Sequence, residues 1–178
     1  MIILMRHGED DPDRLGGWSR AGLTDRGKEQ ARASAEALVR AYPGIRRIVS
    51  SDLPRARETA EIVAERFGLP VELDPAFRET NNGALAGMLK SEAQEKYPGL
   101  RFAALGFDEC YPGGESPRQF AERIRAAWTR FKADVTEDTL LVTHAGVISV
   151  IRCTEDGVAF TNKAMAYYTE QAGFRVIE

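Results

Sequence analysis

Short, continuously apolar segments alternate in this sequence with longer segments in which apolar residues recur every three or four positions. The apolar segments predict buried strands, and the periodic segments predict helices with one buried face. Strands that alternate with helices favour an α/β fold with a mostly parallel central sheet and helices on both of its faces. The predicted strands are residues 1–6, 45–50, 71–73 and 139–143, with two further short strands in 166–178 joined through Gly173.

Capping residues support the helix predictions. Thr24 can cap a helix over residues 25–42, because its hydroxyl can accept a free backbone N–H of the first turn. Ser116 begins the sequence S-P-R-Q, a capping box with proline in the first turn, so a helix is expected to start there. A third helix carries apolar residues at helical spacing across 56–67 and stops at Gly68.

Composition limits the size and the partners of the protein. A chain of 178 residues with 43% hydrophobic content is long enough for one domain with a core, so we expect residues 1–178 to form a single domain. The net charge of -3 gives no overall positive field, so we expect neither nucleic acid nor an anionic membrane as a partner. An anionic ligand would therefore have to bind at a local cluster of cations.

No targeting or membrane segment is recognisable in the sequence. Its apolar runs are shorter than the roughly 18 residues of a membrane helix and than the core of a signal peptide. Cys110 and Cys153 belong to no Cys-x-x-Cys motif, which is typical of reduced structural thiols. We therefore expect a cytoplasmic protein.

Both histidines of the chain lie directly at the end of a predicted strand. MIILMRH ends in His7 and TLLVTH ends in His144, and a small-residue turn, Gly8 or Ala145-Gly146, follows each. A single histidine at such a position is more often a packed or surface residue than a catalytic one. Parallel strands, however, end at the same edge of a sheet, where α/β folds bind ligands. We therefore expect the two imidazole rings to share one pocket.

Two arginines are expected at the same edge. Arg6 precedes His7, and Arg55 lies in the first turn of the helix that follows the strand tip SSDLP. A helix N-terminus offers free N–H groups to anions, and a guanidinium group can hold two phosphate oxygens at once. Arg57, two residues further on, points elsewhere and is interpreted as a surface charge. Two histidines and two arginines at one edge predict a phosphate pocket.

Several motifs occur in order between residue 2 and about residue 151: LMRHGE, GWSRAGLTDRGKEQA, SSDLPRARETA, FRETNNGALAG, GGES and LLVTHAGVI. This series resembles the histidine phosphatase superfamily, the clan of phosphoglycerate mutases and related phosphatases. Several motifs in the correct order are far more specific than any one of them. The resemblance implies a phosphoglycerate mutase-like fold, a three-layer α/β/α sandwich with a mostly parallel central sheet.

The resemblance also implies roles for the residues at the strand tips. His7 would be the nucleophile, which attacks phosphorus and forms a phosphohistidine. Arg6, Arg55 and His144 would hold the phosphoryl oxygens, and a backbone N–H near Ala145 would add to this cradle.

A general acid must also protonate the leaving oxygen. In FRETNNGALAG, Glu79 occupies the position of the acid in the family, where it would first protonate the leaving group and then activate water. The residues alone rank Glu79 no higher than Glu109 or Glu115, because a loop carboxylate is ordinarily solvated. We expect no metal and no cofactor, since the chain has neither an H-E-x-x-H motif nor a cysteine pair.

Three activities are compatible with the resemblance: a phosphomonoester phosphatase, a phosphoglycerate mutase-type phosphoryl transferase, and a low-activity phosphate-binding or regulatory module. The mutases carry a basic insertion, whereas the span between Lys90 and Ser116 is short and contains few cations. The triplet A-G-V after His144 also resembles the phosphatases. A phosphatase acting on a small phosphorylated metabolite is therefore the leading hypothesis. The sequence specifies neither the substrate nor the oligomeric state, and a dimer remains open.

The chain departs from the family pattern in two places. Asp10 stands where relatives often have serine or threonine, and Asp13 stands where an asparagine is common. The acidic segment 9–13 thus places negative charge beside the predicted anion site, which would oppose doubly phosphorylated ligands. The connection across 153–161 is also shorter than in most relatives, so a helix that usually packs there is expected to be missing.

Overall fold

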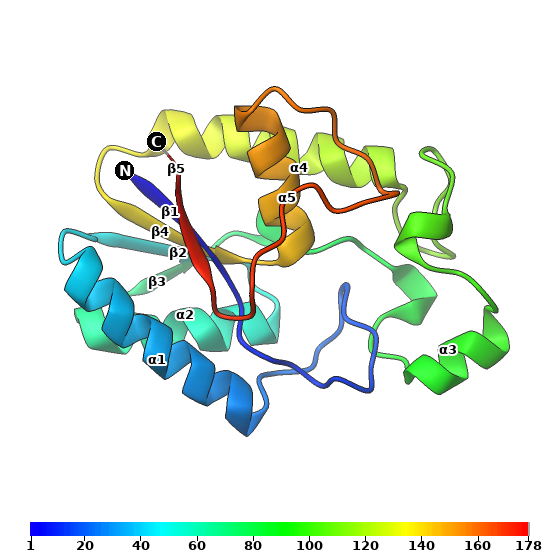
Figure 1. The fold of residues 1–178 in the computed structure, drawn as a ribbon, viewed down its shortest axis with the longest axis horizontal. Coiled ribbons are helices and arrows are strands. Elements are labelled where there is room, and N and C mark those ends of the chain that lie inside the picture. Colours follow the sequence, from blue (N-terminus) through cyan, green and yellow to red (C-terminus); the bar gives the residue numbers. More distant parts are fainter. Residues whose placement is uncertain (178) are drawn as a thin grey trace.

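The computed structural model describes residues 1–177, which form a layered α/β structure around one sheet (Figure 1). The strands lie in the order β3-β2-β4-β1-β5. Neighbouring strands among the first four are parallel, and β5 runs antiparallel to β1 at the edge. The mostly parallel sheet predicted from the sequence is thus confirmed. The strands are β1 (Ile2–Arg6), β2 (Arg47–Ser50), β3 (Val71–Leu73), β4 (Thr139–Thr143) and β5 (Phe174–Ile177).

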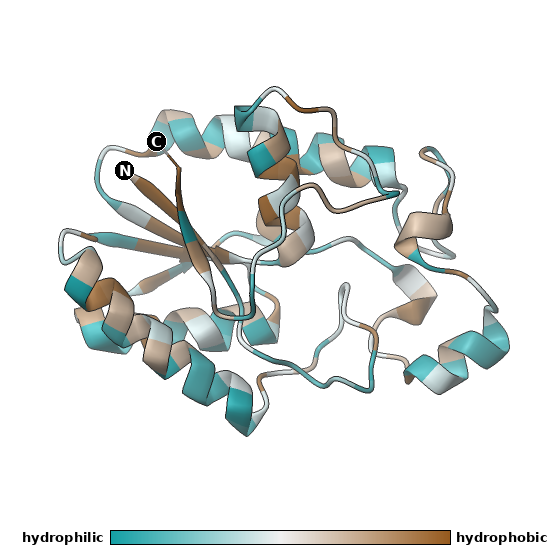
Figure 2. Cartoon of the chain, in the orientation of Figure 1, coloured by the Kyte–Doolittle hydropathy of each residue, from teal (hydrophilic) through white to brown (hydrophobic). Residues whose placement is uncertain are grey.

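Helices cover both faces of the sheet, with α1 and α2 on one side and α4 and α5 on the other (Figure 1). Ile3 and Met5 of β1 pack in the core beneath α1 and α2, whereas Leu4 packs in the core beneath α4 and α5. Successive side chains of a strand point to opposite faces, so a strand buried on both faces must be apolar throughout. Figure 2 shows this hydrophobic character along the central strands. The helices are α1 (Asp25–Ala41), α2 (Pro54–Phe67), α3 (Lys90–Lys96), α4 (Pro117–Asp134) and α5 (Ala145–Glu155).

The predicted helix caps are present. The Thr24 hydroxyl accepts a hydrogen bond from the backbone N–H of Gly27 at the start of α1. Ser116 and Gln119 form the reciprocal capping box of α4. Gly68 ends α2 in the left-handed conformation, with φ of 66°. These local signals placed the helix ends correctly because each depends on a few neighbouring residues only.

The prediction of two C-terminal strands is wrong, because the described part of that segment contains only β5. The backbone before β5 pairs with the end of β1: the Ala172 N–H donates to the His7 carbonyl, and the Arg6 N–H donates to the Gly173 carbonyl. The residues between α5 and β5 form no regular element, and in Figure 1 this orange-to-red segment passes beside α5 and α4 before it returns to the sheet at β5. Glu178, the last residue of the predicted pair, lies outside the described residues.

Two smaller differences concern the strand tips. The predicted turn at Ala145-Gly146 is the first turn of α5. The predicted strand 45–50 begins only at Arg47.

Within residues 1–177, no helix combines the length and the apolar character needed to cross a membrane.

Candidate active site

The two histidines lie side by side at the carboxyl edge of the sheet. β1 and β4 are parallel neighbours with Arg6 opposite Thr143, so the next residue of each strand, His7 and His144, emerges at the same level. Their ring centroids are 5.1 Å apart, and both side chains are buried. The expected proximity of the two imidazole rings is thus observed, although only His7 is among the residues that line the adjoining cavity.

His7 is held as a neutral ring with one defined tautomer. Its Nδ1 lies 2.6 Å from the carbonyl oxygen of Gly8, a hydrogen bond in which Nδ1–H donates and which leaves the lone pair on Nε2. Burial first, and then the positive charge of Arg55, hold the pKa of His7 well below its usual range. The Arg55 Nε–H donates to His7 Nε2 at 3.2 Å and fixes the direction of the lone pair. A neutral ring with its lone pair facing the pocket can act as a nucleophile.

His144 uses its Nε2 in a hydrogen bond and leaves its Nδ1 without a partner among the described residues. Its Nε2 lies 2.9 Å from the hydroxyl oxygen of Ser51, just beyond the end of β2. If this hydroxyl donates, the proton of the neutral ring lies on Nδ1, which is then a donor. Burial and the charge of Arg55 hold the pKa of His144 well below its usual range. Ser51 was not singled out from the sequence, although it lies within the SSDLPRARETA motif.

The arginines are anchored by part of each guanidinium group. Arg6 Nη1 donates to the Thr169 carbonyl at 2.8 Å, and Arg55 Nη2 donates to the Gly17 carbonyl at 2.7 Å. Arg55 is only 2% exposed, and this burial lowers its pKa from the usual value, although an arginine remains charged at neutral pH. By contrast, Arg57 is exposed and pairs with Glu61 on the surface, as predicted.

The buried polar atoms without a partner belong to residues at this edge of the sheet. Within residues 1–177, the buried side-chain nitrogens that lack a hydrogen-bond partner are Arg6 Nε, Arg55 Nη1 and His144 Nδ1. A buried donor without a partner costs free energy, so such groups usually mark a place that a ligand or water fills. All three belong to residues predicted to hold a phosphoryl group.

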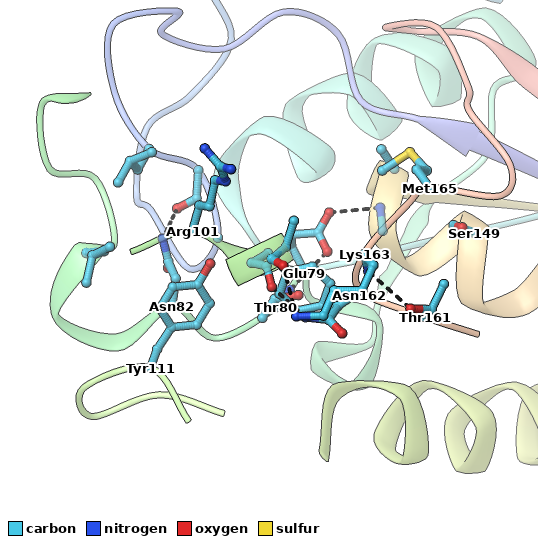
Figure 3. A pocket seen from close by; sticks show the side chains of 18 of the residues that line it. Glu79, Thr80, Asn82, Arg101, Tyr111, Ser149, Thr161, Asn162, Lys163 and Met165 are labelled. Atoms are coloured by element: carbon cyan, nitrogen blue, oxygen red, sulfur yellow. Dashed lines mark hydrogen bonds between the residues drawn. The ribbon is translucent and has the colours of Figure 1, made fainter. Parts of the chain in front are cut away.

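Glu79 lies at the border between two adjoining cavities. Its carboxylate accepts hydrogen bonds from the backbone N–H groups of Gly146 and Thr80, both at 3.0 Å (Figure 3). Glu109, in contrast, is exposed, and Glu115 is paired with Arg123. The structure thus separates Glu79 from the two other carboxylates that the sequence alone could not distinguish from it.

The smaller cavity, of about 410 Å³, is lined by His7, Arg6 and Arg55 among others. The larger cavity, of about 480 Å³, lies on the other side of Glu79 and is shown in Figure 3. Ala145, the first residue of α5, lines both. The first N–H groups of a helix have no partner within it, so this backbone can donate to an anion. An anionic group can thus occupy the smaller cavity while the rest of a ligand extends into the larger one.

Two glycines shape the site without having been predicted to do so. Gly17, at φ of 58°, lies against Asn82, because a Cβ at Gly17 would come within 1.9 Å of the Asn82 side-chain oxygen. Its carbonyl is the anchor of Arg55. At Gly146, an added Cβ would lie 2.4 Å from Glu79 Oε1. A position that requires glycine for a close approach is recognisable only once the fold brings the two segments together.

Replacing Gly146 with alanine is expected to displace the Glu79 carboxylate, because the new methyl group would overlap Oε1. A misplacement of this kind typically costs up to about a hundredfold in rate, so kcat/KM for an alkyl phosphate should fall tenfold to a hundredfold. Gly106→Ala is the matched control, since an added Cβ there would meet only ordinary contacts. Equal activity of both variants would show that the Glu79 position does not matter.

The pH dependence of stability should report the two buried histidines. The unfolded chain binds a proton on each histidine below about pH 6.5, whereas the folded protein does not. Stability is therefore present above that pH and is lost as the pH falls below it, by up to about 1.4 kcal/mol per pH unit for each histidine. Urea unfolding between pH 7 and 5.5 measures this slope. His144→Gln should reduce the slope by about the share of one histidine, and an unchanged slope would contradict a neutral, buried His144.

Comparison with known proteins agrees with this geometry. A profile of the histidine phosphatase superfamily (branch 1) matches residues 2–173. A glucosyl-3-phosphoglycerate phosphatase of Mycolicibacterium vanbaalenii is 33% identical over 175 residues, which cover 90% of this chain and 76% of that protein. A protein of Erwinia tasmaniensis named as a probable phosphoglycerate mutase is 33% identical over 159 residues, covering 86% of this chain and 73% of the relative.

Solved structures extend the likeness to three dimensions. The mycobacterial glucosyl-3-phosphoglycerate phosphatase in complex with VO3 superposes with a TM-score of 0.82 at 29% identity, covering 97% of this chain and 90% of the other. The complex of that mycobacterial phosphatase with inorganic phosphate gives a TM-score of 0.80 at 29% identity, with coverage of 97% and 86%.

Proposed function

Because the chain belongs to the histidine phosphatase superfamily, we propose that it is a phosphomonoester phosphatase that acts on a small phosphorylated metabolite through a phosphohistidine intermediate. The observation that carries this proposal is that the buried side-chain nitrogens without a hydrogen-bond partner, among residues 1–177, belong to Arg6, Arg55 and His144, which lie beside a neutral His7. Unpartnered nitrogens close to one nucleophile suit a phosphoryl group, whose negative charge spreads over three oxygens during transfer.

In the first step, His7 Nε2 forms a bond to phosphorus while the bond from phosphorus to the leaving oxygen breaks. The Arg55 Nε that now contacts Nε2 has to release that lone pair, and phosphoryl oxygens offer it an alternative acceptor. Arg6, Arg55 and His144 hold the oxygens throughout. Their contribution is electrostatic, because they are already oriented before charge develops.

In this proposal Glu79 supplies the proton that the leaving alcohol needs, a role supported by its position in the lining of both cavities. In the second step, Glu79 takes a proton from water as the water attacks the phosphohistidine. The nitrogen–phosphorus bond breaks, inorganic phosphate leaves, and both residues return to their starting states.

The larger cavity would hold the alcohol portion of the substrate. Its volume of about 480 Å³ is in the range of small-molecule sites, and its walls combine apolar side chains with a few polar groups. Glucosyl-3-phosphoglycerate, the substrate named for a relative, is therefore one candidate, beside sugar phosphates, phosphoserine and nucleoside monophosphates.

A phosphoglycerate mutase would need a second group of cations to hold a second phosphate. The larger cavity contains the cationic residues Arg101 and Lys163, but Lys163 Nζ already donates to the carbonyls of Ala103 and Leu105. Arg101 is then the one cation of this cavity lining that remains for a second phosphate. A single cation favours the phosphatase over the mutase. A pure phosphate-binding module would have no use for Glu79 at the cavity border.

Phosphate release tests the proposal. Purified protein in the presence of a chelator should release inorganic phosphate from at least one monoester in a panel that contains the candidates above, and kcat/KM should rank them. Absence of release from the entire panel would overturn the proposed activity.

The proposal keeps the cytoplasmic location predicted from the sequence, which the free thiols of Cys110 and Cys153 support.

A further inference from the structure

The carboxylate of Asp10 lies inside the smaller cavity, next to the groups that would bind phosphate. Its Oδ2 is 3.4 Å from Arg55 Nε, and the side chain is 21% exposed. Its backbone is held by a bridge to Leu23, which fixes the position from which the side chain reaches Arg55. By contrast, Asp13 is exposed and does not line the cavity. Of the two aspartates that depart from the family pattern, only Asp10 lines this cavity.

The other acidic groups around this cavity are occupied elsewhere. Glu9 accepts from the Thr24 hydroxyl and pairs with Arg26. Asp11 pairs with Arg14. Glu79 is held by backbone N–H groups, as described above.

Of the cations around Asp10, some are already bonded to other groups. Lys90 Nζ is bonded to the Pro12 carbonyl, and Arg14 pairs with Asp11. Arg6 acts on Asp10 through its charge alone, and the ring of His7 is neutral. Arg55 is therefore the cation that Asp10 pairs with, and it is also a predicted phosphate ligand.

We propose that Asp10 is an internal anion that competes with the phosphoryl group for Arg55, so that it determines both the affinity of the site for phosphate and the dependence of that affinity on protons. This inference rests on the proposed function only in assigning phosphate to the smaller cavity. An ionised Asp10 repels a phosphate dianion and forms an ion pair with Arg55. A protonated Asp10 releases Arg55 and can donate its O–H to a phosphoryl oxygen.

The environment of Asp10 is consistent with this switch. Burial raises its pKa from the usual value, although the charge of Arg55 acts in the opposite direction. A bound anion raises the pKa further, because it disfavours a second negative charge nearby. Binding of phosphate should therefore be accompanied by proton uptake at Asp10, and it should strengthen as the pH falls.

Binding of inorganic phosphate to the whole protein, measured by calorimetry between pH 5 and 8, tests this inference without any turnover. Asp10→Asn removes the charge at constant size and should bind phosphate about tenfold more tightly than the wild type at pH 8, with the advantage shrinking towards pH 5. The protonation of free phosphate affects both proteins equally, so it cancels in the ratio of their two affinities. Asp13→Asn is the matched control, because it removes the same charge from an exposed neighbour, and it should follow the wild type.

Two results would overturn the inference. Weaker binding by Asp10→Asn at every pH would mean that Asp10 merely positions Arg55, and a ratio that does not change with pH would exclude the proton dependence. Measurements in buffers of different ionisation enthalpy should also show less proton uptake by Asp10→Asn than by the wild type. Because binding is measured directly, failure of the phosphatase proposal would appear as absent turnover and would leave this test decisive.

Discussion

Replacing His7 with alanine is expected to lower kcat by on the order of 10⁴-fold or more, because no phosphohistidine can then form. Neighbouring His144 cannot take over, since its Nε2 is engaged with Ser51 and its Nδ1 is assigned to the phosphoryl oxygens. Release of inorganic phosphate from the best substrate of the panel measures the effect.

Binding of inorganic phosphate to the same variant is the control for folding and for the rest of the pocket. Arg6 and Arg55 are anchored by the Thr169 and Gly17 carbonyls, and Arg55 loses only its contact with His7 Nε2, so both arginines should stay in place. Affinity for phosphate should change by less than about tenfold, or roughly 1.4 kcal/mol. A His7→Ala protein that folds, binds phosphate and retains substantial turnover would show that His7 is not the nucleophile.

Glu79→Gln is expected to lower kcat by roughly 10²- to 10⁴-fold for an alkyl phosphate, the range typical of a lost general acid. The loss should be much smaller for p-nitrophenyl phosphate, because its leaving group departs as a stable anion and needs no proton. The difference between these two substrates is therefore more informative than either rate. Glutamine keeps the size of the side chain, so the cavity border should remain intact.

Glu109→Gln is the matched control for that experiment. It makes the same chemical change on an exposed loop, where the Glu109 carboxylate accepts the Gly106 N–H, and it should leave the rates with both substrates unchanged. If Glu79→Gln slowed both substrates equally, Glu79 would have to act in some way other than by protonating the leaving group.

The sheet and its ligand-binding edge were predictable because their determinants are local. Apolar runs specify the buried strands, and parallel strands necessarily present His7 and His144 at one edge. The place of Arg55 also followed, since it lies in the first turn of the helix after β2.

The contacts between distant loops were not predictable in the same way. Ser51 beside His144, Gly17 beneath Arg55 and Gly146 against Glu79 depend on how separate segments pack, and no periodic pattern encodes such packing. The role of Glu79 came from the family resemblance, and the residues alone did not rank it.

The C-terminal segment was predicted incorrectly for a related reason. Its β-prone composition predicted two strands, but the backbone around Ala172 and Gly173 bonds to the tip of β1 instead. Tertiary contacts thus overrode a local preference. This segment matters for the site, because the Thr169 carbonyl anchors Arg6.

The central claim is that phosphorus becomes bonded to His7 during turnover. Incubation with a monoester that carries a radioactive phosphoryl group, followed by an alkaline quench and peptide mapping, tests it directly. The account predicts a label on the peptide that contains His7, stable to base and labile to acid, and absent from His7→Ala. Label confined to His144, or turnover with no label on the protein even under rapid quench at saturating substrate, would contradict it.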